Sequence, residues 1–255
     1  IDYDAFITQK TKRFESHGFE PLPLIAPAFD WQAHVIQWAV RKGRAALFED
    51  CGLGKTLQQL EWASQVCRHT DGSVIILTPL AVAHQTAKEA SKFGLVATVA
   101  ESQADVTSPG IWITNYEKIE HFDASAFVGV VLDESSILKN FTGKMRKMLT
   151  EKFSQTPYRL GCTATPSPND YSEFRQHADY HGVCSRDQML ATFFLNDTFN
   201  TGDWRLKKHA ESEFWAWLAS WAACVSKPSD IGFSDDGYIL PPLNMHSITV
   251  NVDWT

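Results

Sequence analysis

The sequence predicts an α/β protein, a three-layer domain in which helices cover both faces of a mostly parallel sheet. Short apolar segments alternate with helical ones between residues 44 and 163. Strands that are apolar along their whole length are buried on both faces, as in parallel sheets. A glycine-rich turn follows the first of these strands and two acids end a later one. That arrangement is typical of the ligand-binding edge of an open parallel sheet.

Six strands are predicted in this region. They cover residues 44–49, 73–78, 95–100, 110–114, 128–133 and 158–163. The helices between them are predicted to begin near Lys55, Leu80, Asn115 and Gly143.

The segment before the first strand is predicted to hold two helices. Residues 2–17 have the pattern of a polar amphipathic helix. The prolines of "PLPLIAPAF" (21–29) indicate an extended stretch. Asp30 can then cap a helix that runs to about Lys42, with Gly43 closing it.

The pattern changes after residue 185. The next segment is predicted to be helical and is rich in aromatic side chains: Phe193, Phe194, Phe199, Trp204, Phe214, Trp215, Trp217 and Trp221. Residues 226–242 indicate a loop, and 245–252 alternate like a half-buried strand. The predicted divisions are a core at 1–185, a helical aromatic-rich insertion at 186–225, and a return strand and linker at 226–255.

Composition and charge limit the possible functions. The chain has 255 residues, of which 44% are hydrophobic and 21% charged, so it can bury a sizeable core. The net charge of −7 means that any nucleic acid must be bound by a local basic surface. Five scattered cysteines without a CxxC pair favour a reducing compartment. With no signal peptide and no membrane-spanning apolar run, we expect a cytoplasmic protein without a membrane partner.

The stretch "FEDCGLGKT" (48–56) indicates a phosphate-binding loop. Gly54, Lys55 and Thr56 match the end of the usual pattern, whereas Glu49 stands where the first glycine is usual. Glycines, including Gly52, let the backbone approach a phosphate closely. Exposed N–H groups at the start of a helix then face the anion. A glycine-rich turn without a ligand is the plainer alternative.

A second predicted strand supports the nucleotide interpretation. "VVLDES" (130–135) is an apolar strand that ends in Asp133 and Glu134. We expect Asp133 to hold Mg²⁺, together with Thr56, and Glu134 to orient or deprotonate the attacking water. Lys55 would reach the outer phosphates.

In these two segments the sequence resembles superfamily 2 helicases and translocases of the Swi/Snf type. The phosphate loop of that branch typically reads Asp-Glu-Met-Gly-Leu-Gly-Lys-Thr, which "EDCGLGKT" (49–56) matches, including the acidic start and Leu53. "LDESSILKN" (132–140) resembles the Asp-Glu-Ala-His…Leu-Lys-Asn segment, but with Ser135 and Ser136 in place of Ala-His. The resemblance implies a RecA-like P-loop NTPase fold that uses ATP and Mg²⁺.

Further motifs follow in the order expected for that branch. "FDWQ" (29–32) resembles the glutamine motif, in which Gln32 would read the adenine. "LTPLAVAHQ" (77–85), "ITNYEKI" (113–119) and the segment after the acids resemble motifs that contact the nucleic-acid backbone. The resemblance assigns such contacts to Thr78, Pro79, Asn115, Tyr116 and Lys139. "GCTATPSPND" (161–170) resembles the motif in which Thr163 and Thr165 would couple the nucleotide state to the nucleic acid.

The resemblance also implies that the chain is half of a motor. "KPSDIGF…ILPPLNMHSITV" (227–250) is similar to the segment that leads to a second RecA-like lobe, and that lobe is absent from this chain. We expect ATP hydrolysis to drive movement along nucleic acid, with double-stranded DNA as the favoured polymer. Without arginines from the second lobe, hydrolysis by this part alone should be slow. The two serines after Asp133-Glu134 and the tryptophan-rich insert resemble those of phage and prophage proteins.

Several features leave alternatives open. Lys139, Lys144, Arg146 and Lys147 could line a phosphate track or a solvated helix face. His177, His181 and Cys184 have a spacing that a metal could use, but without a second ligand pair ordinary histidines are favoured. The period of Phe214, Trp217, Leu218, Trp221 and Val225 favours a core helix over a docking or base-stacking face. Cys51 lies inside the phosphate loop, either as a filler or as a thiol whose alkylation would hinder nucleotide binding.

Two other functions are kept as alternatives. A nucleotide-switch ATPase would never touch nucleic acid, and its turnover would ignore DNA. A degenerate protein-docking module would bind no ATP at all.

Overall fold

The computed structural model describes residues 14–140, 143–196, 204–239 and 245–247. A sheet of seven parallel strands forms its centre, in the order β3-β4-β2-β5-β6-β1-β9. The strands are β1 (Arg44–Glu49), β2 (Val74–Thr78), β3 (Ala97–Val99), β4 (Ile111–Asn115), β5 (Gly129–Asp133), β6 (Tyr158–Thr163) and β9 (Ala222–Val225). The predicted α/β fold with a parallel sheet is therefore confirmed.

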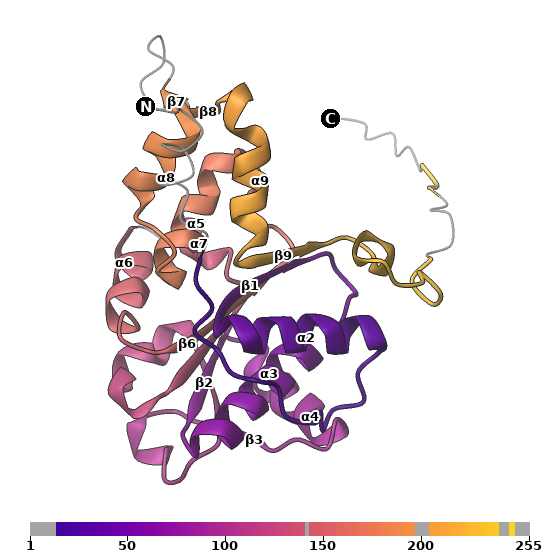
Figure 1. Cartoon of the computed structure of the whole chain (residues 1–255). Coiled ribbons are helices and arrows are strands. Elements are labelled where there is room, and N and C mark those ends of the chain that lie inside the picture. The colour runs from indigo at the N-terminus through magenta and orange to yellow at the C-terminus, as the bar shows by residue number, and fades with distance from the viewer. Residues whose placement is uncertain (1–13, 141–142, 197–203, 240–244, 248–255) are drawn as a thin grey trace, which may run out of the picture.

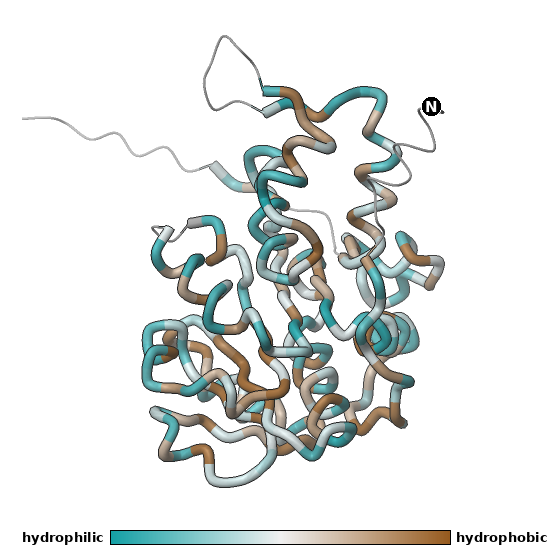
Figure 2. Tube along the Cα trace, turned by 60° about the vertical axis from the view of Figure 1, so that its left-hand side comes forward, coloured by the Kyte–Doolittle hydropathy of each residue, from teal (hydrophilic) through white to brown (hydrophobic). Residues whose placement is uncertain are grey.

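Helices cover both faces of this sheet (Figure 1). The α-helices are α2 (Asp30–Lys42), α3 (Lys55–Thr70), α4 (Ala83–Lys92), α5 (Ile137–Asn140), α6 (Gly143–Lys152), α7 (Phe174–His181), α8 (Arg186–Phe193) and α9 (Glu211–Ala219). The 3₁₀ helices are η1 (Gln103–Asp105), η2 (Tyr116–His121), η3 (Ala124–Ala126), η4 (Tyr171–Glu173), η5 (Lys208–Ala210) and η6 (Pro228–Ile231). Along the helices, hydrophobic and hydrophilic residues alternate as expected for elements that bury one side (Figure 2).

Strand β1 shows how the two faces differ. Ala45 and Leu47 pack into the core beneath α2 and α3, whereas Ala46 and Phe48 pack into an aromatic core formed with α7, α8 and α9. Successive side chains of a strand point to opposite faces, so one strand contributes to both cores. The chain just after β1 is consequently held between two packed layers.

The predicted strands agree with the structure to within one or two residues at each end. The helix expected near Asn115 is a 3₁₀ helix, η2, and the one expected near Leu80 begins at Ala83. Asp30 is the first residue of α2 and not its cap, which is Phe29. Gly43 closes α2 with a φ of 72°, as predicted.

The prediction of helix throughout 186–225 is wrong in two places. Strands β7 (Phe194–Asn196) and β8 (Trp204–Leu206) pair antiparallel beside α8. Strand β9 lies at the edge of the main sheet, parallel to β1. A short apolar run fits a helix and a strand equally well by periodicity. The free edge of β1 supplies backbone partners for β9, and this contact is not visible in the local pattern. The division of the chain at 185 and 225 otherwise stays a prediction.

Two further predictions concern the ends of the chain. Residues 2–13 of the helix expected at 2–17 lie outside the described residues, and residues 14–17 are not helical. The backbone there pairs with the end of α2, with His17 N donating to Lys42 O at 3.0 Å. The strand expected at 245–252 lies outside the described residues from 248 onward. Within the described part of the chain, no helix has the length and hydrophobicity needed to span a membrane.

Candidate active site

The predicted phosphate loop joins β1 to α3 and has the backbone that its glycines allow. Gly52 and Gly54 have φ values of 84° and 80°, a region that other residues rarely adopt. A side-chain atom on Gly54 would lie 2.5 Å from the Gln32 amide nitrogen, whereas Gly52 has open space where a side chain would be. The loop is therefore closed on its inner side and open to an approaching anion at Gly52.

Lys55, the first residue of α3, folds its side chain over this loop. Its Nζ donates to the carbonyl oxygens of Glu49 at 2.9 Å and Asp50 at 3.0 Å. Thr56 follows in the first turn of α3 and is half-buried. The first N–H groups of a helix have no partner within the helix. The loop and the first turn of α3 therefore carry a cationic amine, a hydroxyl and backbone N–H groups.

Glu49, the departure from the usual loop pattern, is fully buried and supports the loop helix. Its Oε2 accepts a hydrogen bond from Gln58 Nε2 at 2.7 Å. Burial raises the pKa of Glu49 to about 7, and the bond from Gln58 and the charge of Lys55 only partly oppose this rise. The roles of Glu49 and Gln58 could not be deduced from the spacing of the motif alone.

Asp133, at the end of β5, lies on the same edge of the sheet as the loop. Its Oδ1 accepts a hydrogen bond from Gln59 Nε2 of α3 at 3.2 Å. Burial raises the pKa of Asp133 to about 6; the bond from Gln59 and the charge of Lys55 lower it, while Glu134 raises it further. The bond from Gln59 joins the helix that Lys55 begins to the strand end that carries the acids, and a shared phosphate and magnesium site stays a prediction. Gln59, which connects them, was missed, because glutamine on a helix carries no motif signal.

Glu134 begins a sharp turn after β5. Its φ of 57° is unusual for a residue other than glycine, and such backbone is concentrated at functional sites. Its carboxylate accepts a hydrogen bond from Thr163 Oγ1 at 3.2 Å, and Thr163 Oγ1 accepts one from Thr165 N at 3.1 Å. The exposed Glu134 is thus linked to both threonines that the resemblance assigned to coupling.

Gln32 is buried and uses both ends of its amide inside the protein. Its Oε1 accepts from Phe29 N at 3.1 Å, and its Nε2 donates to Leu53 O at 2.9 Å. In this arrangement Gln32 holds the phosphate loop through Leu53, and one hydrogen bond engages each end of its amide.

Four of the five side chains assigned to nucleic-acid contact lie in the interior. Thr78, Asn115 and Tyr116 are 0%, 5% and 1% exposed. The Tyr116 hydroxyl donates to the Asp133 carbonyl oxygen at 2.7 Å. The Lys139 side chain is 4% exposed, and its Nζ donates to the Thr165 carbonyl oxygen. Pro79 is partly exposed as a whole residue, and so is Lys139, whose side chain is nevertheless buried. The motifs place these residues at the carboxyl edge of the sheet, but burial depends on packing that a motif does not encode.

The remaining features resolve in different ways. His177 and His181 are fully buried in the core, and burial lowers the pKa of His177 to about 3. No group of three potential metal ligands occurs in the described part of the chain. Lys144 and Lys147 are exposed, and Lys147 lies 3.8 Å from Glu151 one turn later. Cys51 is exposed in the phosphate loop.

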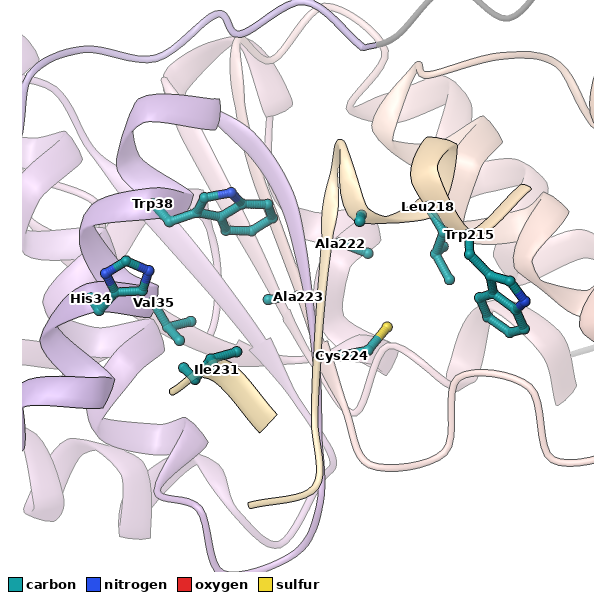
Figure 3. A pocket seen from close by; sticks show the side chains of 10 residues that line it. His34, Val35, Trp38, Trp215, Leu218, Ala222, Ala223, Cys224 and Ile231 are labelled. Atoms are coloured by element: carbon teal, nitrogen blue, oxygen red, sulfur yellow. The ribbon is translucent and has the colours of Figure 1, made fainter. Parts of the chain in front are cut away.

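An apolar cavity of about 370 Å³ lies apart from the phosphate loop (Figure 3). Its walls come from α2 and α9, with Trp38 on one side and Trp215 and Leu218 on the other. Its floor is β9, with Ala223 and Cys224. Helix α9 thus packs Phe214, Trp217 and Leu218 into the core, as predicted, while its Trp215 is exposed. Trp221 and Val225 are also buried, but they lie beyond the end of this helix.

A parallel sheet with a phosphate loop after one strand and paired acids after another defines a RecA-like P-loop NTPase lobe. Residues 31–177 match the SNF2-related domain family. Because this match covers more than half of the chain, the chain belongs to that family. The Swi/Snf-type assignment is therefore confirmed. Comparison with curated protein sequences found no match.

The fold is also similar to solved structures. The Sulfolobus solfataricus SWI2/SNF2 ATPase core in complex with dsDNA has a TM-score of 0.63 and 24% identity, over 80% of this chain and 46% of that one. The core domain from the same organism gives 0.62 and 20%, over 82% and 44%. The UvsW helicase from bacteriophage T4 gives 0.51 and 14%, over 71% and 64%. These likenesses show the fold, and the chain spans less than half of either Sulfolobus chain.

Proposed function

We propose that this lobe binds Mg²⁺-ATP and hydrolyses it to drive movement along double-stranded DNA. The observation that carries the proposal is the hydrogen bond from Gln59 to Asp133, 3.2 Å long, which brings the loop helix and the acidic strand end together. The family implies the use of ATP. The DNA part has weaker support, namely the likeness to a SWI2/SNF2 core in complex with dsDNA.

The residues present fit the phosphates and the metal. Lys55 and the free N–H groups of the loop would neutralise the phosphate oxygens. The Thr56 hydroxyl and the Asp133 carboxylate are oxygen ligands of the kind that Mg²⁺ prefers. A bound Mg²⁺ would supply charge neutralisation on the phosphates.

Glu134 is the proposed base. Its exposed carboxylate, oriented by Thr163 Oγ1 at 3.2 Å, would accept a proton from the attacking water. Most of the remaining catalysis would come from placement and charge stabilisation. The stabilising arginines belong to a second lobe in our proposal, and their loss typically costs a factor of roughly 10³ or more.

We refine two of the expected contacts, the one with adenine and the one with nucleic acid. Gln32 already bonds Phe29 N and Leu53 O, so we infer that it shapes the loop as well as reading the adenine. Nucleic acid would meet the chain at the partly exposed Pro79 and exposed Leu80, beside a small cavity lined by His84 and Lys118. The buried Thr78, Asn115, Tyr116 and Lys139 would support this edge from inside.

The decisive experiment measures ATP turnover by the full-length protein with duplex DNA, single-stranded DNA, RNA or no nucleic acid. Duplex DNA should stimulate turnover most, and the stimulation should fall as salt rises, because phosphate contacts release counterions. Lys55→Ala should abolish ATP binding. Turnover indifferent to every nucleic acid would favour a nucleotide switch, and absence of ATP binding in the parent would favour a docking module. We propose that the protein acts in the cytoplasm. The phage or prophage origin of the chain stays a prediction.

A further inference from the structure

Buried polar atoms without a partner lie in the acidic turn, the segment Asp133–Ser136, and next to it. Ser135 and His181 are both 0% exposed. Neither Ser135 Oγ nor either ring nitrogen of His181 has a hydrogen-bond partner among the described residues. The proposed function assigns no role to these groups.

Gly161 of β6 brings the two side chains to one place. A side-chain atom on Gly161 would lie 3.0 Å from His181 Nε2 and 3.4 Å from Ser135 Oγ. The hydroxyl on the acidic turn and the imidazole on α7 therefore both lie beside Gly161. A side chain at residue 161 would contact both of them.

Leaving these atoms unpaired would be costly. A buried donor or acceptor without a partner is worse than an apolar group of the same shape. Burial lowers the pKa of His181 well below its ordinary value, so the ring is neutral and has one donor and one acceptor. Buried polar groups of this kind are normally satisfied by ordered water.

We propose that Ser135 and His181 are hydrogen-bonded across Gly161 through one ordered water molecule, and that His181 thereby positions the acidic turn. The turn is otherwise anchored by Ser135 N, which donates to Cys162 O at 2.8 Å. A second anchor through the Ser135 side chain opposes rotation of the strained Glu134 backbone. This positioning role rests on the proposed function; the water bridge itself does not.

The bridge connects the active-site turn to the helical layer. α7 carries His181 and packs against both α6 and α8. The His181 ring also lies against Trp221, with ring centroids 5.9 Å apart. A structural change at Glu134 during the ATP cycle would therefore be transmitted to the aromatic core that includes α9.

The bridge can be tested by NMR of the chain labelled with ¹⁵N-histidine, with the His181 resonances assigned from His181→Gln. Ser135→Ala should shift the ring nitrogens of His181. Thr150→Val is the matched control, because Thr150 Oγ1 is also buried without a partner but lies on α6. It should leave His181 unchanged. Unchanged His181 resonances in a folded Ser135→Ala chain would overturn the proposal.

Turnover by the full-length protein separates positioning from simple packing. Ser135→Ala and His181→Leu should lower kcat on the order of tenfold at unchanged ATP affinity, the scale of one hydrogen bond. His181→Gln, which keeps a polar atom near Nε2, should retain most of kcat. Equal loss in Gln and Leu variants of equal thermal stability would contradict positioning. If the parent itself does not hydrolyse ATP, the proposed function fails, and the NMR result still decides on the bridge.

Discussion

The phosphate loop takes most of its side-chain contacts from residues close to it in the chain, with Gln32 as the exception, whereas the acidic turn takes its contacts from distant residues. Lys55 binds the carbonyl groups of Glu49 and Asp50, and Gln58 binds Glu49. The acidic turn is held instead by Gln59, Tyr116 and Thr163, from three separate elements. The loop is therefore specified mainly by its own segment, and the turn depends on the assembled sheet. Variants at the two regions should differ accordingly.

The largest effect is expected at the acidic turn. Glu134→Gln in the full-length protein should lower ATP turnover by roughly 10²–10⁴-fold, because a general base is lost, and should leave ATP binding intact. Steady-state turnover and equilibrium binding measure the two quantities. Glu120→Gln, at an exposed acid of η2, is the control and should behave as the parent. Normal turnover in Glu134→Gln would remove Glu134 from the mechanism.

The phosphate loop should make the stability of the protein depend on pH, through Glu49. The pKa of Glu49 rises from an ordinary 4.5 to about 7 on folding, so between these values the folded chain holds a proton that the unfolded chain has released. Stability is thus highest below this window and falls as pH rises through it, by up to about 3 kcal/mol. Glu49→Gln should remove this part of the slope. Urea unfolding of the parent and of Glu49→Gln at about pH 5 and pH 8 tests this prediction. If the free energy of unfolding changes equally in both proteins between these pH values, the prediction is refuted.

Gly161→Ala should weaken the acidic turn from below. The added methyl group would lie 3.0 Å from His181 Nε2 and 3.3 Å from Ser135 Cβ, which overpacks the space. We expect a loss of about 1–3 kcal/mol in the free energy of unfolding. Gly143→Ala, at the start of α6, is the control and should be neutral or slightly stabilising. If the two variants are equally stable in thermal unfolding, the turn tolerates a methyl group at residue 161 and the prediction is wrong.

The smallest effect is expected at Tyr116. Tyr116→Phe removes the 2.7 Å hydrogen bond to the Asp133 carbonyl oxygen and should cost about 1 kcal/mol of unfolding free energy. Tyr171→Phe, at a side chain that is 48% exposed, is the control and should cost less. If both variants unfold at the same urea concentration, Tyr116 does not support the turn.

Much of the fold could be predicted because its signals are local. Six of the seven strands of the main sheet follow from apolar runs, and the loop follows from Gly52, Gly54 and Lys55. β9 could not be predicted, since four residues pair only with an already formed edge of β1. The buried positions of Tyr116 and Lys139 were also missed. A motif identifies residue types, and only packing decides which side of the sheet edge they face.

The sequence by itself determined the family, the parallel sheet, and the segments that carry the lysine and the acids. These depend on hydrophobic periodicity and on glycine backbone, which act within a few residues. Only the tertiary structure decided that Gln59 joins the loop helix to the acidic strand end, that Gln32 holds the loop, and that Ser135 and His181 both lie beside Gly161. Such contacts join residues far apart in the chain, and their energies exist only once burial has removed water from between them.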